Sequence, residues 1–259
     1  MKSETILTLT TDWGTTDQYV AAVKGLLLQT CPELRVVDVS HNIAPFNMQD
    51  AAFVVGNTYP FFPKNSIHFI GVNFFTQPDA PMVVARADGH YFIWTKNDYL
   101  CFVAPHFEQV VQLAEQSTVH SVTLDVLPYV ATNLLKDNDL QKLGNVVEIK
   151  NSLAKNPVIE QNSIVLHVLH IDHYGNAITN LTQEIFEAEH KNRKFTIFLG
   201  ARKYAINCIS TTYIDVQPGY PVAFFNRRHL LEIACVAGNA SKIYKLNTES
   251  TILIKFEKT

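Results

Sequence analysis

The pattern of hydrophobic residues changes in the middle of the chain, and this change constrains the fold more than any other feature. In the first half, short apolar runs typical of strands alternate with segments whose apolar residues recur at helical spacing. Between Asp137 and Asn162 the chain is rich in Asn, Lys, Asp and Gln and has only weak periodicity. Beyond it, short strand-like runs are separated by Gly and Asn turns. We therefore predict two domains joined by a polar connection.

The two halves predict different architectures. Strand–helix–strand order over residues 1–150 predicts an α/β domain with a central, mostly parallel sheet between helices. Residues 151–162 are expected to form a linker, and the strand-like runs in 163–259 predict a smaller β-barrel domain. In such α/β sheets ligands bind beyond the carboxyl ends of the strands. Asp12, His41 and Asn73 follow expected strands and therefore mark a candidate site.

Composition and charge exclude several classes of protein. With 47% apolar and 17% charged residues, the chain has the composition of an ordinary globular protein. A net charge of -3 without a basic cluster argues against a nucleic-acid partner. The start lacks a basic segment followed by an apolar core, and no apolar run approaches the ~20 residues that cross a bilayer. The widely spaced cysteines indicate reduced thiols, so we expect a cytoplasmic protein away from membranes.

The first motif that suggests chemistry is Thr-Asp-Trp-Gly at residues 11–14. A carboxylate at a strand exit can accept both hydroxyl groups of a ribose, and Gly14 lets a ligand approach the backbone closely. Spacing alone is equally consistent with Asp12 capping the helix that follows. The motif is therefore consistent with a ribose site and equally consistent with a helix cap.

The second motif is Asp-Val-Ser-His at residues 38–41, followed by Phe46. A histidine after a strand can be catalytic, but a histidine hydrogen-bonded to nearby backbone is more common. Phe46 can stack on a ligand or enter the core, and burial in the core is the more frequent fate of such a residue. We expect the ordinary structural role for both residues from the pattern alone.

The third motif contains three histidines around Asp172, a combination that suggests a metal site. Alternation along a strand, however, places His170 and Asp172 on one face and His167 and His173 on the other. Four convergent ligands are therefore not available locally, and we expect no metal. A carboxylate and an amide, Asp172 and Asn176, instead suggest recognition of an amino-acid head group.

The fourth motif begins at Asn226 and contains Arg228 in an expected turn between two strands. An arginine in such a turn can pair with a substrate carboxylate through two parallel hydrogen bonds. A solvated arginine without a ligand is the ordinary alternative. The pattern does not choose between these roles.

Together, and in this order, the motifs resemble the S-adenosylmethionine (SAM) hydroxide adenosyltransferases, which are related to the bacterial fluorinase and chlorinase. The matching blocks are Thr-Asp-Trp-Gly, Asp-x-x-His-x-Ile-x-Pro, Asp-x-Tyr-Gly-Asn-x-x-Thr-Asn and Asn-x-x-x-x-Leu-Glu-Ile-Ala, and they extend from Asp12 to Ala240. The resemblance implies an α/β N-terminal domain, a β-barrel C-terminal domain and a homotrimer. It also implies that SAM binds where neighbouring subunits meet.

The resemblance implies roles for the matching residues that would hold the ribose and the methionine. Asp12 would bind the ribose hydroxyls, and Phe46 would line the adenosyl pocket. Asp17 and Asp172 would face the methionine amino group, and Arg228 would lie on the side of its carboxylate.

The remaining matches concern the base. Tyr174 and Asn176 would contact the adenine or the neighbouring walls, and Ala240 would lie at the adenine edge. SAM would be the substrate or ligand, and no further cofactor or metal is expected.

The family's reaction displaces methionine from the 5′ carbon of the ribose, and its hydrolytic members use an Asp, an Arg and a His to activate water. Here the Asp position is Asn73, and no Arg follows before Arg86. In the later block only Asp125 matches clearly, while His120 lies two positions too early. An amide cannot accept a proton as a carboxylate does. The residues left as catalytic candidates are Asn73, Asp125 and His120.

Three functions therefore stay open. The first is hydrolysis of SAM to adenosine and methionine. The second is a catalytically silent member that binds an adenosyl ligand or acts as a scaffold. The third is metal-dependent hydrolysis through His170 and Asp172.

Overall fold

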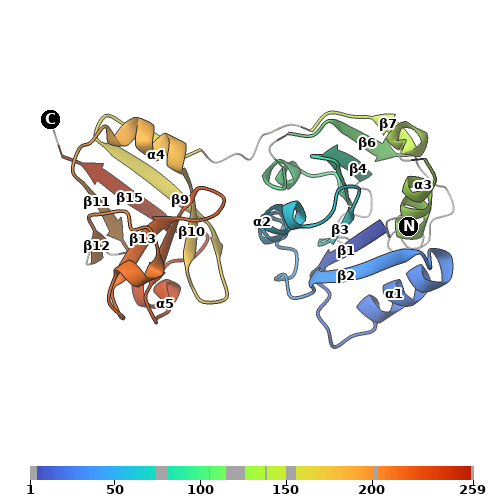
Figure 1. Ribbon diagram of the computed structural model, residues 1–259, viewed down its shortest axis with the longest axis horizontal. Coiled ribbons are helices and arrows are strands. Elements are labelled where there is room, and N and C mark those ends of the chain that lie inside the picture. Colours follow the sequence, from blue (N-terminus) through green and yellow to red (C-terminus); the bar gives the residue numbers. More distant parts are fainter. Residues whose placement is uncertain are drawn as a thin grey trace. The chain divides into compact units, whose positions relative to one another are not determined.

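The computed structural model describes residues 5–73, 81–104, 106–114, 126–137, 139–149, 156–200 and 204–257. The chain divides into two compact units, Met1–Ala154 and Lys155–Thr259, both visible in Figure 1. The expected linker at 151–162 includes a strand, β8 (Val158–Glu160), that belongs to the second unit. Val158 and Ile159 form this strand because they pair with the neighbouring strand at Val165 and Ile164.

The first unit contains a sheet of seven strands in its described residues, in the order β2-β1-β3-β5-β4-β6-β7. The strands are β1 (Thr5–Thr11), β2 (Leu34–Ser40), β3 (Ile67–Gly71), β4 (Met82–Ala87), β5 (His90–Thr95), β6 (Gln109–Leu113) and β7 (Gly144–Val146). β3, β4 and β5 are almost entirely buried, as expected for strands covered on both faces.

The expectation of a mostly parallel sheet is wrong, because the sheet is mixed. β1 pairs in parallel with β2 and β3, and β3 pairs in parallel with β5. The pairs β4–β5, β4–β6 and β6–β7 are antiparallel. The reversal begins at the two-residue turn Asp88-Gly89, where both residues have positive φ, 50° and 72°. That backbone is the one that joins adjacent antiparallel strands in a tight hairpin.

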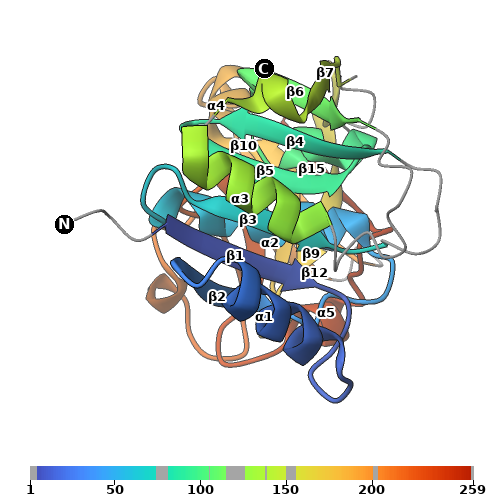
Figure 2. The same ribbon diagram turned by 90° about the vertical axis from the view of Figure 1, so that its right-hand side faces the viewer.

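Helices cover both faces of this sheet. α1 (Tyr19–Thr30) and α3 (Leu127–Asp137) pack on the face that carries Leu7 and Leu9. α2 (Met48–Thr58) packs on the opposite face, against Ile70 and Phe92. In Figure 2, α1 and α3 lie in front of the sheet and α2 lies behind it. Short 3-10 helices lie at Tyr59–Phe61, Asp98–Phe102 and Leu140–Leu143.

The second unit contains an eight-stranded antiparallel sheet in its described residues, in the order β12-β11-β15-β9-β10-β14-β13, with β8 pairing β9. Its other strands are β9 (Ser163–Ile171), β10 (Ala177–Thr182), β11 (Phe195–Leu199), β12 (Tyr204–Ile206), β13 (Pro221–Phe225), β14 (Leu230–Cys235) and β15 (Thr251–Phe256). Its helices are α4 (Gln183–His190), α5 (Ala240–Tyr244) and a 3-10 turn at Tyr213–Asp215.

The two ends of this strand order approach each other, so the sheet is nearly closed into a barrel. Ser210, just after β12, donates its backbone N–H to the carbonyl of Ala223 in β13 over 2.8 Å. Alternating residues of β9, such as Ile164, Leu166 and Val168, point into one buried core. A barrel-like second unit agrees with the expectation from the sequence.

None of the helices in the described part of the chain combines the length and the apolar character that a membrane crossing requires.

Candidate functional site

Three residues marked by the sequence lie at one edge of the first unit's sheet. Asp12 follows β1, His41 follows β2, and Asn73 lies two residues after β3. Because β1 pairs in parallel with both β2 and β3, the carboxyl ends of the three strands meet at the same edge. The structure therefore brings these residues together as expected.

The carboxylate of Asp12 is held by two backbone amides from separate loops. Its Oδ2 accepts the N–H of Phe46 over 2.9 Å and the N–H of Asn73 over 3.2 Å. Both donors have left-handed backbone, with φ of 65° and 57°. Such backbone is unfavourable by about 1–3 kcal/mol for a residue other than glycine, so its surroundings must stabilise it. Among the described residues Oδ1 of Asp12 has no hydrogen-bond donor, and this oxygen is available to a ligand.

Phe46 lies outside the core, contrary to the expectation from the pattern alone. Its surface is 59% exposed. The physical reason is the left-handed turn, in which the Phe46 amide points to Asp12 while the ring stays at the surface. An exposed ring beside a carboxylate can stack on a ligand that the carboxylate holds.

Gly14 closes the loop after Asp12. Its φ is 69°, and its N–H donates to the carbonyl of His41 over 2.8 Å. A Cβ added at this position would meet no described atom within 4 Å. The left-handed backbone favours glycine at this position, and the space that a side chain would enter is empty of described atoms.

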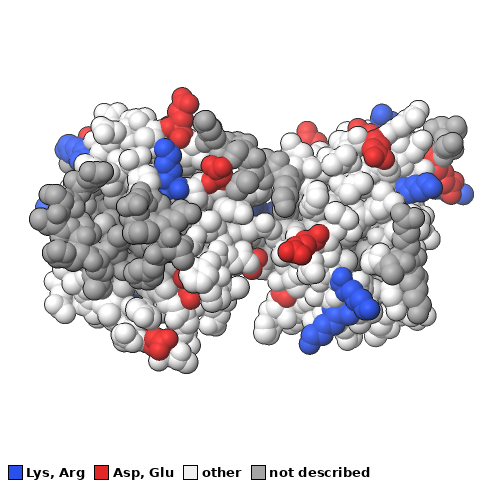
Figure 3. Space-filling model, turned by 180° about the vertical axis from the view of Figure 1, so that it is seen from behind, with Lys and Arg blue, Asp and Glu red and all other residues white. Residues whose placement is uncertain are grey.

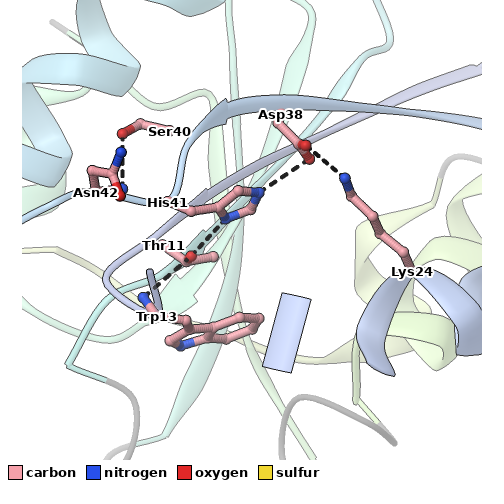
Figure 4. Close-up of polar contacts among 7 residues, drawn as sticks. All are labelled: Thr11, Trp13, Lys24, Asp38, Ser40, His41 and Asn42. Atoms are coloured by element: carbon pink, nitrogen blue, oxygen red, sulfur yellow. Dashed lines mark hydrogen bonds and ion pairs between the residues drawn. The ribbon is translucent and has the colours of Figure 1, made fainter. Parts of the chain in front are cut away.

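His41 is part of a chain of polar contacts that Figure 4 shows. Its Nδ1 lies 2.8 Å from Thr11 Oγ1, and its Nε2 lies 3.1 Å from Asp38 Oδ1. Because a carboxylate only accepts, an interaction with Asp38 requires a proton on Nε2, and a neutral ring then accepts the Thr11 hydroxyl at Nδ1. His41 is 6% exposed, with Thr11 Oγ1 hydrogen-bonded to Nδ1 and an Asp38 carboxylate oxygen within ion-pair distance of Nε2. This geometry fits a structural role, although its partners are side chains instead of the expected backbone.

The other end of this chain is Lys24, whose Nζ lies 2.5 Å from Asp38 Oδ2. Partial burial acts to raise the pKa of Asp38, but the hydrogen bonds and charges of Lys24 and His41 outweigh it. The pKa of Asp38 is therefore below its ordinary value, and the carboxylate stays ionised at neutral pH.

The remaining predictions in the first unit have different outcomes. Asp17 is exposed in the loop before α1 and takes no part in the contacts of Asp12. The side chain of Asn73 donates from Nδ2 to Met48 Sδ over 3.6 Å. Asp125 and His120 lie outside the described residues.

In the second unit, Asp172 positions Asn176 within the turn between β9 and β10. Asp172 Oδ1 accepts the backbone N–H of Asn176 over 2.8 Å, and Oδ2 accepts its Nδ2 over 2.9 Å. Gly175, with φ of 88°, lies in the same turn and packs against Asn239. The predicted carboxylate and amide are therefore bound to each other.

Asn176 lines a pocket of about 420 Å³. Tyr174, which is 75% exposed, and Tyr213 are its aromatic lining residues, and residues 235–238 complete the lining. Ala240, expected at an adenine edge, is fully buried at the start of α5. Ala237, and not Ala240, is among the residues that line the pocket.

Glu232 is a polar residue near the pocket that the sequence analysis missed. It is 6% exposed in β14, where Oε1 accepts the Tyr213 hydroxyl over 2.5 Å and Oε2 accepts Asn226 Nδ2 over 3.3 Å. Burial raises the pKa of Glu232, and these two hydrogen bonds oppose the increase. A glutamate within the apolar run Leu-Leu-Glu-Ile-Ala-Cys was the available signal, because a buried acid needs partners.

Arg228 is exposed in the turn that joins β13 to β14. Asn226 Oδ1 accepts the backbone N–H of Arg228 over 3.0 Å and that of Leu230 over 3.2 Å. The same Asn226 donates to Glu232, so one side chain links the arginine turn to the buried acid.

The described residues bear on two further kinds of site, a metal centre and a charged patch. They contain no group of three His, Cys, Asp or Glu side chains that could hold a metal ion. On the face in Figure 3, Lys and Arg are scattered among Asp and Glu and do not gather in a patch.

Comparison with protein families identifies the chain. Residues 7–144 match the N-terminal domain of the SAM hydroxide adenosyltransferases, and residues 166–253 match their C-terminal domain. The chain belongs to this family. The N-terminal match contains Asp12 and Asn73, and the C-terminal match contains Asn176 and Glu232, so the candidate residues of each unit lie within a SAM hydroxide adenosyltransferase domain.

Relatives within the family carry two different names. The (R)-S-adenosyl-L-methionine hydrolase of Methanocaldococcus jannaschii is 26% identical over 93% of this chain and 92% of that protein. The fluorinase of Actinoplanes sp. is 23% identical over 96% of this chain and 97% of that protein. A crystal structure of an uncharacterized conserved protein from Thermotoga maritima has the same fold, with a TM-score of 0.80, 21% identity and coverage of 96% and 98%. Because relatives within the family carry different names, membership alone does not determine which reaction this chain catalyses. That question depends on the residues of its own site.

Proposed function

We propose that this chain binds SAM and hydrolyses it to adenosine and methionine. The observation that carries the proposal is the carboxylate of Asp12, one oxygen of which is fixed by two amides while the other is available. A ribose presents two adjacent hydroxyl donors, and a carboxylate oxygen with free lone pairs accepts both. We assign the ribose to this oxygen and assign the exposed ring of Phe46 to the adjacent wall.

The pocket beside Asn176 is proposed to hold the adenine. Its volume of about 420 Å³ accommodates a purine, and an aromatic side chain such as Tyr174 offers a stacking surface. In the homotrimer that the family resemblance implies, neighbouring subunits would supply the ribose and base sites. Light scattering on the purified protein tests this assembly, and a monomer at micromolar concentration would contradict it.

The methionine end is assigned to charged side chains. Arg228 is exposed in its turn, where its guanidinium can reach a carboxylate. Each oxygen of Asp172 carries more than one lone pair, so it can accept from an ammonium group while it holds Asn176. Asp17 is the second acidic residue assigned to this ammonium group.

The proposed reaction is an in-line displacement. The water oxygen forms a bond to the ribose 5′ carbon, and the bond from this carbon to sulfur breaks. The electron pair of that bond goes to the sulfonium, which leaves as neutral thioether, and the water gives one proton to a base. Asn73 cannot be this base, because its amide does not accept a proton. Asp125 and His120 remain the predicted candidates.

Asn73 also favours a second function, namely a family member that binds the adenosyl ligand without turning it over. The backbone of Asn73 supports Asp12, while its side chain donates to the sulfur of Met48. The backbone of residue 73 can therefore still hold Asp12 in the proposed ribose site, but its side chain provides no group that accepts a proton. Such a protein would act as an adenosyl-binding or scaffold protein.

One experiment separates the two functions. The purified protein is titrated with SAM in a calorimeter, and adenosine and methionine are quantified by chromatography against a protein-free incubation. Asp12→Asn is the sharpest variant, because its carbonyl can still accept from Phe46 and Asn73 while its NH₂ cannot accept from a ribose. Product formation that this variant abolishes supports hydrolysis. Binding without product supports the silent member, and no binding overturns both.

A further inference from the structure

The amide of Asn176 has a defined orientation in the pocket. Its Nδ2 lies 2.9 Å from Asp172 Oδ2 and 3.4 Å from the hydroxyl oxygen of Tyr213. A carboxylate only accepts hydrogen bonds, so the group that faces Asp172 must be the NH₂ and not the carbonyl. Asn176 Oδ1 has no donor among the described residues and is not a buried atom. The side chain therefore presents a hydrogen-bond acceptor to the pocket that it lines.

Tyr213 completes this orientation because Glu232 fixes the direction of its hydroxyl. The Tyr213 hydroxyl donates to Glu232 Oε1 over 2.5 Å, which leaves a lone pair of its oxygen for the second N–H of Asn176. The Tyr213 ring packs edge-on against Phe224 with centroids 4.4 Å apart, so its position is also constrained.

Glu232 itself cannot turn away easily. Its second oxygen accepts from Asn226, and the residue is 6% exposed within β14. Burial and the adjacent Glu232 both raise the pKa of Tyr213, so its hydroxyl keeps its proton and remains a donor at neutral pH. A continuous series of hydrogen bonds thus runs from Asn226 through Glu232 and Tyr213 to Asn176.

We propose that Glu232 is a positioning residue that acts through Tyr213 to keep the Asn176 carbonyl toward the ligand, so that the pocket selects a 6-amino purine over a 6-oxo purine. A 6-amino group donates to this carbonyl, whereas a 6-oxo group opposes it with lone pairs. The inference rests on the proposed function, in which this pocket holds the base.

The test compares adenosine with inosine, which differ at position 6 of the purine. Dissociation constants of both nucleosides are measured by calorimetry on the full-length protein. The variants are Tyr213→Phe, Glu232→Met and Glu232→Gln, with Tyr220→Phe as a matched control because Tyr220 is 60% exposed. Thermal unfolding establishes that each variant is folded.

The wild type and the control should prefer adenosine by about tenfold, the discrimination expected of one to two hydrogen bonds. Tyr213→Phe and Glu232→Met should reduce this preference about fivefold, mainly by weakening adenosine. Glu232→Gln should retain more of the preference than Glu232→Met, because its carbonyl can accept from Tyr213, although its NH₂ then faces the donor Nδ2 of Asn226.

Two results would overturn the inference while leaving the proposed function standing. One is an unchanged ratio of the two constants in Tyr213→Phe and Glu232→Met. The other is an equal weakening of both nucleosides, which is what a merely structural role produces. A wild-type protein that binds neither SAM nor adenosine would instead overturn the proposed function, and the inference with it.

Discussion

Thr11 Oγ1 and His41 Nδ1 lie 2.8 Å apart, and this hydrogen bond joins the end of β1 to the residue that follows β2. The carbonyl of His41 also accepts the N–H of Gly14 over 2.8 Å. His41 therefore contacts the chain on both sides of Asp12. A histidine that is almost inaccessible to solvent can in this way determine the position of a carboxylate that it does not touch.

Replacing His41 with leucine should destabilise the first unit. The substitution leaves the Thr11 hydroxyl and the Asp38 carboxylate without their ring partner, so the free energy of unfolding should fall by about 1–3 kcal/mol. Urea unfolding measures this change. Ser40→Ala, which removes only a local bond to the Asn42 amide, should change it by about 0.5 kcal/mol or less. Equal stability of the two variants would contradict the role assigned to His41.

Alanine at Gly14 should affect ligand binding beyond its effect on stability. Gly14 and Gly219 both have positive φ, 69° and 87°, and a Cβ at either would meet no described atom within 4 Å. Each Gly→Ala change should therefore lower the free energy of unfolding by about 1–2 kcal/mol through backbone strain alone. Only Gly14→Ala should also weaken SAM binding in calorimetry, because it fills the space beside Asp12. Matching affinities in the two variants would count against a ribose at this loop.

The buried histidine pair of the first unit should make stability depend on pH. His68 Nδ1 lies 2.8 Å from Thr8 Oγ1, and His68 Nε2 lies 3.1 Å from His90 Nδ1. Burial, with a contribution from His90, lowers the pKa of His68 from 6.5 to about 3. Between these pH values the unfolded chain binds a proton that the folded chain does not, so stability falls as pH decreases.

His68→Gln should flatten this dependence between pH 4 and 7 by removing the group that titrates only on unfolding. The measurement is the free energy of urea unfolding at several pH values, for the variant relative to the wild type. His106→Gln, at an exposed histidine, serves as the control and should leave the slope unchanged. A slope that His68→Gln does not alter would show that the acid sensitivity arises elsewhere.

Glu232 should produce a dependence of the opposite sign. Burial raises its pKa above 4.5, so the folded chain retains a proton that the unfolded chain releases. As pH rises from about 4.5, the wild type should therefore lose stability relative to Glu232→Gln. Glu249→Gln, at an exposed glutamate, is the matched control. If the difference between wild type and Glu232→Gln is the same at pH 4 and pH 7, burial does not perturb this acid.

The sequence allowed the edge of the sheet that carries the proposed ribose site to be predicted. Asp12, His41 and Asn73 follow apolar runs, and the parallel pairing of consecutive strands places them together. The antiparallel half of the sheet was harder to predict. The turn at Asp88-Gly89 indicated a local hairpin between β4 and β5. The pairing of β4 with β6 is not local, and nothing in the sequence pattern indicated which residues of the two strands pair.

Residues whose role depends on distant partners were the least predictable. Phe46 is exposed because its amide bonds to Asp12, which lies 34 residues earlier in the chain. Tyr213 reaches the pocket through contacts with Asn176 and Glu232, and nothing in its own polar segment indicates this position. Glu232 differs, because an acid inside an apolar strand requires partners and was therefore open to prediction.

The two left-handed residues that donate to Asp12 have a consequence for the kinetics of binding. Phe46 and Asn73 already hold their loops in place through the Asp12 carboxylate before any ligand arrives. Association at this edge then requires no ordering of either loop, and little conformational entropy is lost there when a ribose binds. Differences in affinity among ribose-containing ligands should consequently appear in how slowly they leave rather than in how quickly they arrive.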